Sequence, residues 1–244
     1  RIPLTVGSTT RYASYLSGSG TSALAFRYTV QSGDEDADGV AVSAVVDLNG
    51  GTLQDSAGND LNTTLNSLGN TSSVLVDAVA PSGYSVSFDD STLNASESDS
   101  VSFTFAGAEV GADYSYSISS NGGGTPVTGT GTVSDGAQQI TGLDVGNLGD
   151  GTLTLSVALT DEAGNQSSSV TTTATLDATA ASVTLDSAAD PVTHAEFTVS
   201  ITFDEPVNGF AVGDITVSNA TVGSFSGSGA SYTATITPTD DGTV

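Results

Sequence analysis

The sequence predicts an all-β chain of tandem β-sandwich modules, of which the first and the last are incomplete. Short strand-like runs recur between Gly, Asn and Asp turns at spacings of roughly 8 to 12 residues, a pattern typical of sandwiches. Two kinds of segment also recur about 100 residues apart along the 244 residues. The turn Asp-x-Ala-Gly-Asn occurs at 55–59 and at 161–165, and linkers that contain an aspartate occur at 75–88 and 175–187.

A third internal match sets the expected module boundaries. Residues 17–40 align with residues 226–244, so that Val244 falls opposite Val40. The expected modules are the C-terminal portion of one sandwich at 1–78 (the first module), a complete sandwich at 79–178 (the middle module) and the N-terminal portion of another at 179–244 (the third module). Since cut modules would expose hydrophobic half cores, we expect the natural polypeptide to extend beyond Arg1 and Val244.

Seven strands are expected in the middle module, at 83–88, 100–105, 114–119, 126–133, 137–143, 152–160 and 167–176. Seven strands in about 95 residues is the count of an immunoglobulin-like sandwich. The steps Asn121-Gly122 and Asp135-Gly136 are predicted to supply the positive-φ residues of tight hairpins. The sequence has no Cys and no Trp, so only the architecture is predicted and not an antibody-type domain.

The charge of the chain excludes several classes of partner. Three Arg and no Lys face 28 Asp plus Glu, which gives a formal net charge of -25. Nucleic acids and anionic membranes both require clustered basic residues, so neither is an expected partner. No run of about 18 apolar residues occurs, and we therefore expect no direct membrane insertion. Such a surface favours cations instead.

The sequence offers no credible catalytic set, so we expect no enzyme. The absence of Cys removes cysteine nucleophiles and thiolate metal sites together. His194 is the only histidine, and a lone imidazole at the start of a predicted strand is expected to be a surface residue. The Gly-rich run at 120–126 has no following helix and no Lys, which indicates a hairpin turn rather than a phosphate loop.

Several segments together resemble the bacterial Ig-like repeats of very large secreted adhesins. They are the run at 11–61, the linker VDAVAP at 76–81, the turn LTDEAGN at 159–165 and the run at 197–222. The resemblance implies an extender: repeated sandwiches that project a ligand-binding tip from a bacterial cell surface, often stiffened by calcium between modules. It also implies an extracellular location and, as partners, neighbouring Ig-like modules of the same or identical chains. The proline that usually follows the linker is present at Pro81 and replaced by Ala181.

An acidic loop in the first module raises the question of a metal. The run SGDEDADGV at 32–40 sets Asp34, Asp36 and Asp38 at alternate positions, which is how an EF-hand loop begins. An EF-hand is nevertheless excluded, because Val45 stands where the bidentate glutamate is required and the flanking runs are strand-like. In an Ig-like sandwich this loop, between the fifth and sixth strands, faces the following module.

We therefore expect calcium at the two module junctions, with oxygen ligands from several chain segments. The candidate ligands at the first junction are Asp34, Asp36, Asp38, Asp77, Asp161 and Asn165, with Glu109 or Asp113 in addition. The candidate ligands at the second junction are Asp144, Asp150, Asp177, Asp204 and Glu205. The resemblance favours the linker aspartate and the aspartate of the Asp-x-Ala-Gly-Asn turn. The alternative is that these acids only shape turns, since Asp and Asn cap their own backbone.

Two functions from different classes remain open at this level. One is the extender of a surface adhesin; the other is a self-assembling structural protein of an extracellular filament, sheath or biofilm matrix, since an unpaired sheet edge is a template for another chain. Carbohydrate binding is a weaker third possibility, because clustered tyrosines could form a sugar platform, although core or cross-strand packing is favoured. The tyrosines in question are Tyr12, Tyr15 and Tyr28, or Tyr114 and Tyr116.

Overall fold

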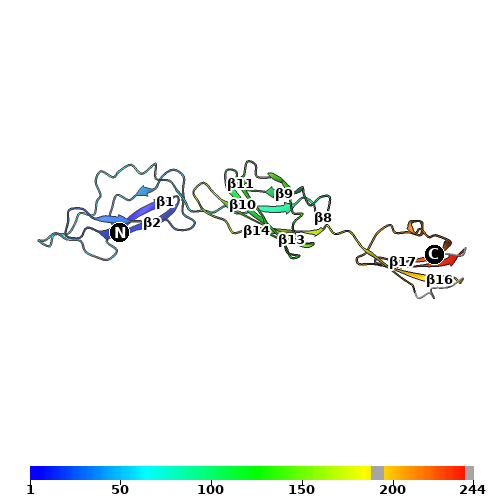
Figure 1. Ribbon diagram of the computed structural model, residues 1–244. Helices are drawn as coiled ribbons and strands as arrows, with labels where there is room; N and C mark the ends of the chain where they lie inside the picture. Colours follow the sequence, from blue (N-terminus) through cyan, green and yellow to red (C-terminus); the bar gives the residue numbers. More distant parts are fainter. Residues whose placement is uncertain (188–194, 240–244) are drawn as a thin grey trace. The chain divides into compact units, whose positions relative to one another are not determined.

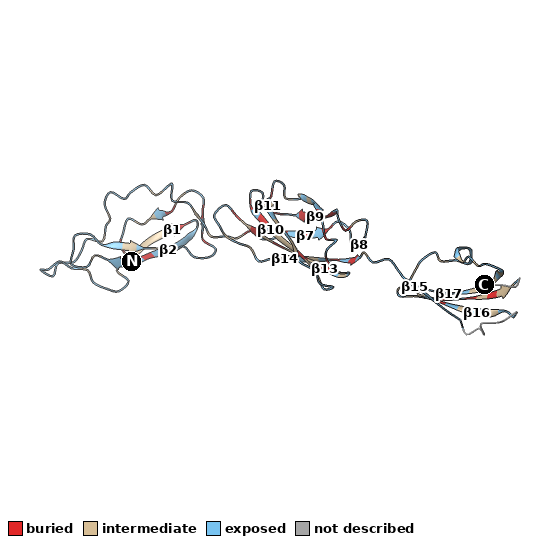
Figure 2. Cartoon of the chain, viewed as in Figure 1, coloured by how far each residue is buried: buried red, intermediate tan, exposed pale blue. Residues whose placement is uncertain are grey.

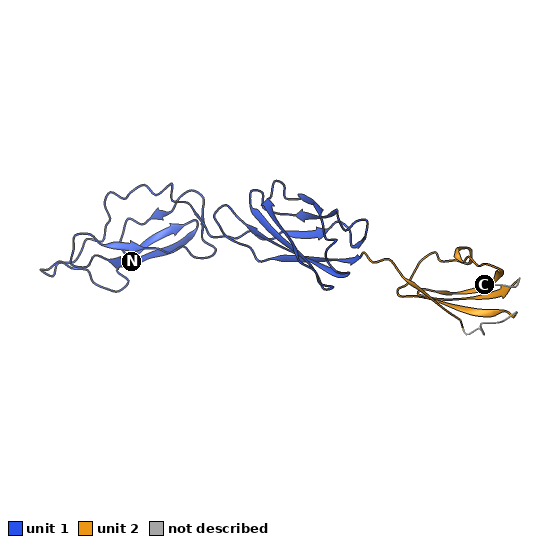
Figure 3. Cartoon of the chain, viewed as in Figure 1, with its two compact units in different colours: residues 1–177 blue, residues 178–244 orange. Residues whose placement is uncertain are grey.

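The structure, a computed structural model, describes residues 1–187 and 195–239 of the chain. Their regular structure is β apart from one short 3-10 helix, η1, at Val212–Asp214. The chain divides into two compact units, Arg1–Asp177 and Ala178–Val244 (Figure 3). None of the helices in the described residues is long and apolar enough to cross a membrane. The predicted all-β class is confirmed.

The first module contains one four-stranded antiparallel sheet and a short two-stranded ladder (Figure 1). The four-stranded sheet consists, in spatial order, of β3 (Ala25–Arg27), β2 (Thr9–Ser17), β1 (Ile2–Val6) and β5 (Ala41–Val42). The two-stranded ladder joins β4 (Glu35–Asp36) to β6 (Val76–Asp77). The buried apolar side chains of the first module are few, namely Val6, Ala13, Val40 and Val46.

The middle module is a two-layered sandwich (Figure 1). One sheet has the order β12 (Gln139–Leu143), β9 (Val101–Ala106), β7 (Ser85–Phe88). The other has the order β11 (Val127–Thr132), β10 (Asp113–Ser120), β13 (Gly151–Thr160), β14 (Val170–Asp177), β8 (Thr92–Asn94). All seven predicted strands are present. The eighth, β8, was not predicted: three residues are too few for an alternating pattern, and it forms only by pairing in parallel with β14.

The core of the middle module follows from alternation along two central strands. Phe103 and Phe105 on β9 and Leu153 and Leu155 on β13 are fully buried, because every second side chain of a strand points to the same face. Figure 2 shows buried residues on the strands of the middle module. Burying each such side chain stabilises the fold by about 1.5–3 kcal/mol.

Tyr114 and Tyr116 belong to this core layer rather than to a sugar platform. Tyr116 lies edge-on to Phe103, with ring centroids 5.6 Å apart, and Tyr114 is buried. Across the β10–β11 ladder, Tyr114 pairs with Gly131 and Tyr116 with Gly129. A Cβ on either glycine would lie 2.5 Å from the partner tyrosine, so the glycines leave room for the rings.

The predicted hairpin glycines are wrong in detail. Gly122 and Gly136 do not adopt positive φ; beside the first of them, Gly123 (φ 95°) and Gly124 (φ 97°) do. Gly122 is instead required by a close approach, because a Cβ there would lie 2.1 Å from the carbonyl oxygen of Asp150. The tertiary contact, and not the turn type, therefore selects glycine at this position.

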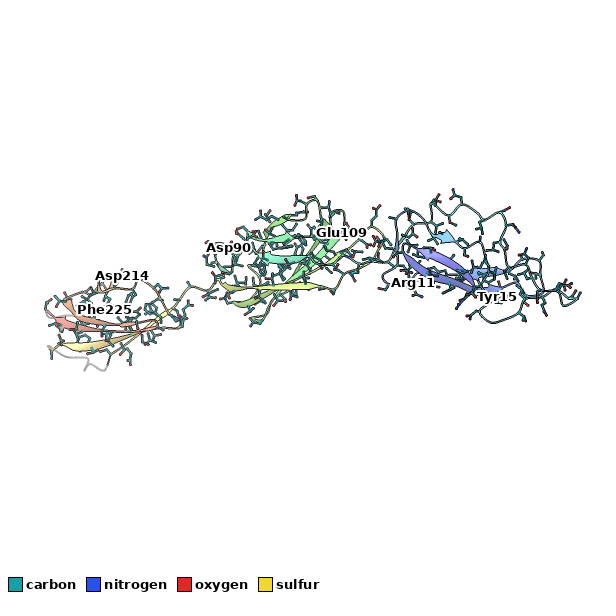
Figure 4. All side chains as sticks on the ribbon, turned by 180° about the vertical axis from the view of Figure 1, so that it is seen from behind. Arg11, Tyr15, Asp90, Glu109, Asp214 and Phe225 are labelled. Carbon is teal, nitrogen blue, oxygen red and sulfur yellow. The ribbon has the colours of Figure 1, made fainter. Side chains whose placement is uncertain are left out.

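The unit Ala178–Val244 is built on one antiparallel sheet in its described part. Its spatial order is β15 (Val183–Ser187), β16 (Phe197–Phe203), β18 (Ser231–Pro238), β17 (Ala220–Ser228). Ile201, Tyr232, Ala234 and Ile236 form the buried cluster. Phe210, in the segment that leads to η1, packs on this face, with its ring centroid 5.0 Å from that of Tyr232. Figure 4 shows Phe225 on the sheet and Asp214 on the segment that crosses it.

Candidate module-junction site

The Asp-x-Ala-Gly-Asn turn of the middle module is held together by its own terminal residues. The Asp161 amide donates to the Asn165 carbonyl at 3.1 Å, and the Asn165 amide donates to Asp161 Oδ1 at 2.7 Å. Gly164 adopts φ 90°, a left-handed conformation that glycine adopts without strain. Burial acts to raise the pKa of Asp161, but the hydrogen bonds from Asn165 and from the turn backbone hold it below its usual value.

The linker meets this turn at Asp77. The Asn165 side-chain amide donates to the Asp77 carbonyl oxygen at 3.1 Å and to Asp161 Oδ2 at 2.8 Å, and it lies 3.4 Å from Asp77 Oδ1. The structure therefore brings together three residues that the sequence predicts at the first junction: Asp77, Asp161 and Asn165.

The other side of the linker is fastened to the acidic loop of the first module. In the β4–β6 ladder, Glu35 pairs with Asp77 and Asp36 with Val76. The Gly33 amide donates to the Ala78 carbonyl oxygen, and the Ala78 amide donates to that of Asp34, both at 2.8 Å. The acidic loop thus lies at the junction, and it holds the linker through its backbone.

The Asp34 side chain is hydrogen bonded within the first module. Arg11 Nε donates to Asp34 Oδ1 at 2.7 Å, the Gln31 amide donates to Oδ2 at 2.8 Å, and Tyr28 Oη also donates to Oδ2. Asp34 is only 2% exposed. Burial acts to raise the pKa of Asp34, but the hydrogen bonds from Tyr28, the Gln31 amide and Arg11 outweigh it and hold the pKa below its usual value.

Asp36 is likewise occupied by protein donors. Its Oδ2 accepts the Gly7 amide at 2.7 Å and its Oδ1 accepts the Gly39 amide at 2.7 Å. These bonds, that from Gly7 first, hold the pKa of Asp36 below its usual value. Asp38 remains exposed on the loop. The alternate aspartates therefore fold the loop: Asp34 ties it to β2, and Asp36 ties it to the β1–β2 turn.

The two additional candidate calcium ligands in the middle module, Asp113 and Glu109, differ in their hydrogen bonding. Asp113 accepts a hydrogen bond from Thr132 Oγ1 at 2.7 Å across the β10–β11 ladder. Glu109 is exposed in the loop between β9 and β10, and Figure 4 shows it at the end of the middle module that the linker enters. Calcium binding by Glu109 or Asp113 stays a prediction.

The residues predicted for the second junction lie in both units. Asp144 accepts the Gly146 amide at 2.9 Å, and Asp177, the last residue of β14, pairs with Asn94 of β8. Asp204 accepts the amide and the hydroxyl of Ser182, each at 2.7 Å. The remaining two candidates are Asp150, which precedes β13, and Glu205, which follows Asp204. Calcium binding by this second set stays a prediction.

Over residues 1–187 and 195–239, no three or more His, Cys, Asp or Glu side chains are grouped so that they could hold a metal ion. The side chains that do converge at the first junction are the Asp161 carboxylate of the turn, the linker residue Asp77 and the Asn165 amide. His194 lies outside the described residues.

Two contributors to the junction escaped the sequence analysis. Arg11 neutralises the buried Asp34, and Tyr84 Oη donates to the Val157 carbonyl oxygen at 3.1 Å and hydrogen bonds Ser167 Oγ at 2.8 Å. Tyr84 thereby ties the segment that follows the linker to the hairpin that carries the Asp-x-Ala-Gly-Asn turn. The rarity of arginine in so acidic a chain was the available signal for Arg11; no signal in the sequence pointed to Tyr84.

The sheet order of the middle module defines an immunoglobulin-like sandwich, with the first, second and fifth long strands in one sheet and the remaining four in the other. Residues 177–244 match the family model described as a bacterial Ig-like domain.

A solved structure described as a tetra-tandem repeat in the extending region of a large adhesion protein matches with 22% identity and a TM-score of 0.36. The match covers 97% of this chain, and the chain spans 54% of that structure's length. A comparison with curated proteins gives no match.

Proposed function

We propose that this chain is an extender segment of a large bacterial cell-surface or secreted adhesin. The observation that carries the proposal is the linker at 76–78, which is bonded to both modules: its backbone pairs with β4, and its Asp77 accepts from Asn165. A tie of this kind limits bending between neighbouring sandwiches. The match of residues 177–244 to a bacterial Ig-like domain supports the same function.

We further propose that calcium rigidifies the junction. The Asp77 carbonyl oxygen, Asp77 Oδ1 and Asp161 Oδ2 surround the Asn165 amide nitrogen at 3.1, 3.4 and 2.8 Å. Rotation of that amide by 180° would exchange nitrogen for oxygen and leave a cluster of oxygens alone, the donor set that calcium prefers. We propose that further oxygens come from water and from Glu109, which lies at the same end of the middle module (Figure 4).

Small-angle scattering of the chain, in calcium and then in chelator, tests the rigidified extender. Extracellular calcium modules bind with dissociation constants of roughly 10⁻⁴ to 10⁻³ M, and at about ten times that concentration each site adds about 1.4 kcal/mol. We expect a larger maximum dimension and a higher melting temperature with calcium, and a weaker effect of magnesium, which demands stricter geometry.

The matched variants identify the ligands. Asp77→Ala combined with Asp177→Ala should remove the calcium response, whereas Asp60→Ala, an exposed aspartate that accepts a hydrogen bond from Gln54 Nε2 within the first module, should keep it. An unchanged dimension and melting temperature in the original chain would refute the calcium staple, and a response that persists in the double variant would refute these ligands.

A self-assembling structural protein is the second candidate. It is favoured by β15, an edge strand of its sheet, on which Val183 and Leu185 are 53% and 65% exposed. A strand from another copy could pair there and cover both side chains. Analytical ultracentrifugation separates the two functions: growth of large assemblies with concentration supports self-assembly, and a concentration-independent monomer supports the extender.

We also propose that the chain has no hydrolase or transferase activity of its own. The proposal rests on the missing cysteine and the single histidine of the sequence, since a nucleophile needs a positioned base. An activity that survives purification and disappears on a single substitution within this chain would contradict it.

A further inference from the structure

Strand β11 lies at the edge of the larger sheet of the middle module (Figure 1). It pairs with β10 along all six of its residues, Val127 to Thr132, and has no strand on its other side among the described residues. Both sheets of this module are described, and β11 lies in the interior of the chain. Its open edge is therefore a property of the fold of this module.

The ladder with β10 decides which backbone groups face the open edge. The Val133 amide donates to the Ala112 carbonyl oxygen at 2.9 Å, and the pairing continues from there to Val127 without a register shift. Successive residues of an antiparallel strand turn their backbone groups to opposite sides, so the odd-numbered residues of β11 bond to β10. The other three residues, which are exposed, direct their amides and carbonyls to the open edge: Thr128, Thr130 and Thr132.

The other three sheet edges of the middle module are protected against pairing, and β11 is not. Sheets protect their edges by short strands, charges or irregular register. Strand β8 has only three residues, β7 is followed directly by Asp89 and Asp90, and the register of β12 shifts between Ile140 and Leu143. Strand β11 contains no charged residue, no proline and no register shift. In a chain of net charge -25, it is the edge that a second copy can approach without facing a carboxylate on the strand.

We propose that β11 pairs in antiparallel fashion with β11 of a second copy, about a two-fold axis at Thr130. In this register Thr130 faces its own counterpart, and Thr128 of each copy faces Thr132 of the other. Each of these residue pairs exchanges two backbone hydrogen bonds, so every outward-facing amide and carbonyl of both strands is satisfied. The inference goes beyond the proposed function, because neither an extender nor growth through β15 requires this contact.

The two-fold axis also keeps the Asp113 carboxylates of the two copies apart. Asp113 lies on β10 level with Thr132, at one end of β11, and its counterpart lies level with the opposite end. Three strand spacings across the sheet and four residues along it separate the two side chains by about 20 Å, beyond the screening length of about 8 Å at 0.15 M salt. Since the contact is small, we expect weak association, with a dissociation constant on the order of 10⁻⁴ M.

Disulfide trapping in the 244-residue chain, which has no native Cys, tests the register. Thr130→Cys places two thiols opposite each other across the axis, at a backbone separation that a disulfide spans. Thr128→Cys is equally exposed, but its two thiols would lie about 14 Å apart. In a glutathione redox buffer with about 0.15 M salt, we expect Thr130→Cys to form the linked dimer at least about fivefold faster. Equal rates for the two variants would overturn the proposal.

A proline and an alanine at the same position test the backbone bonds. Thr130→Pro removes an amide that faces the open edge and none that bonds to β10, so it should fold as the original chain does and remain monomeric. Thr130→Ala keeps the amide and should associate as the original chain does. In sedimentation equilibrium at rising concentration, the masses of the original chain and of Thr130→Ala should approach twice 24.1 kDa, whereas Thr130→Pro should stay at 24.1 kDa.

A monomeric original chain at about 1 mM would overturn the proposal, as would a rise in mass that Thr130→Pro leaves unchanged. If Thr130→Pro fails to fold, as judged by circular dichroism, the rates of the two cysteine variants decide the matter alone. An isologous pair closes on itself, so a mass that levels off at the dimer is distinguishable from assemblies that grow through β15. The extender is tested separately, by the scattering experiment.

Discussion

At the scale of single residues, the role of an aspartate here depends on which donors surround it. Asp34 and Asp36 look like metal ligands in the sequence, yet in the structure they accept hydrogen bonds from Arg11, Tyr28 and backbone amides. A buried carboxylate without such donors would be costly, so these bonds specify the conformation of the loop. The loop in turn presents the backbone edge that pairs with the linker.

A pH dependence follows from the lowered pKa of Asp34. A carboxylate whose native pKa lies below its unfolded value binds fewer protons when folded, so its stabilisation is full above about pH 4 and is lost as the pH falls through the native pKa. Thermal melts between pH 7 and about pH 2.5 should therefore show falling stability. Asp34→Asn should lower the melting temperature at pH 7 by about 5 °C or more.

The difference between Asp34→Asn and the original chain should shrink at the acid end, because both side chains are then neutral. The exposed Asp99→Asn serves as the control and should leave the melting temperature at pH 7 nearly unchanged. A constant difference across the whole pH range would contradict the role of the Asp34 charge.

At the scale of elements, strand β11 shows how glycine and tyrosine act together. The run from Val127 to Thr132 alternates glycine with β-branched residues, and each glycine faces a tyrosine of β10. Glycine alone weakens a strand. Here the rings of Tyr114 and Tyr116 lie over Gly131 and Gly129, and they bury the backbone that glycine would leave bare.

Substitution of one of these glycines should therefore destabilise the middle module. Gly129→Ala places a Cβ 2.5 Å from the Tyr116 ring and should cost about 1–3 kcal/mol, as overpacking does. Thr130→Ala on the same strand, whose side chain is exposed, should change stability by no more than about 0.5 kcal/mol. Chemical denaturation measures both.

The ring can be removed to check the cause. In a Tyr116→Leu background the added penalty of Gly129→Ala should become smaller, because the clashing ring is absent. Equal penalties in the two backgrounds would show that the tyrosine is not what excludes the alanine.

At the scale of the whole molecule, a net charge of -25 acts on every module. Like charges repel in the compact state, and the repulsion reaches further when the solution contains little salt. Of the 29 buried apolar side chains among the described residues, 21 lie in the middle module, and the first and third modules have four each. Repulsion therefore most nearly offsets packing in the first and third modules.

We expect simple salt to stabilise the chain. Raising sodium chloride from 10 to 150 mM shortens the screening length from about 30 to about 8 Å, so the melting temperature should rise by a few degrees, and potassium chloride should act alike. A further rise with calcium at equal ionic strength would indicate binding rather than screening. A melting temperature that is independent of sodium chloride would contradict the repulsion.

The sequence by itself determined the class of fold and most of its strands. In runs such as 152–160, apolar and polar residues alternate. This local pattern specifies a strand, because every second side chain of a strand lies on the same face and can be buried there. The placement of the acidic loop and of the linker Asp77 at one junction was also predictable, since the topology of a sandwich fixes the end at which each loop lies. The calcium that the sequence predicts there stays a proposal.

Only the tertiary structure decided which carboxylates receive hydrogen bonds from the protein itself. Arg11 and Asp34 are 23 residues apart, and Asn165 and Asp77 are 88 apart; no local pattern encodes such pairs. The short β8 and the glycine at Gly122 depend equally on distant segments. Local periodicity follows from the chain's own geometry, whereas the partner of a polar side chain is chosen by the whole fold, because burial removes water and leaves only those donors that the fold brings near.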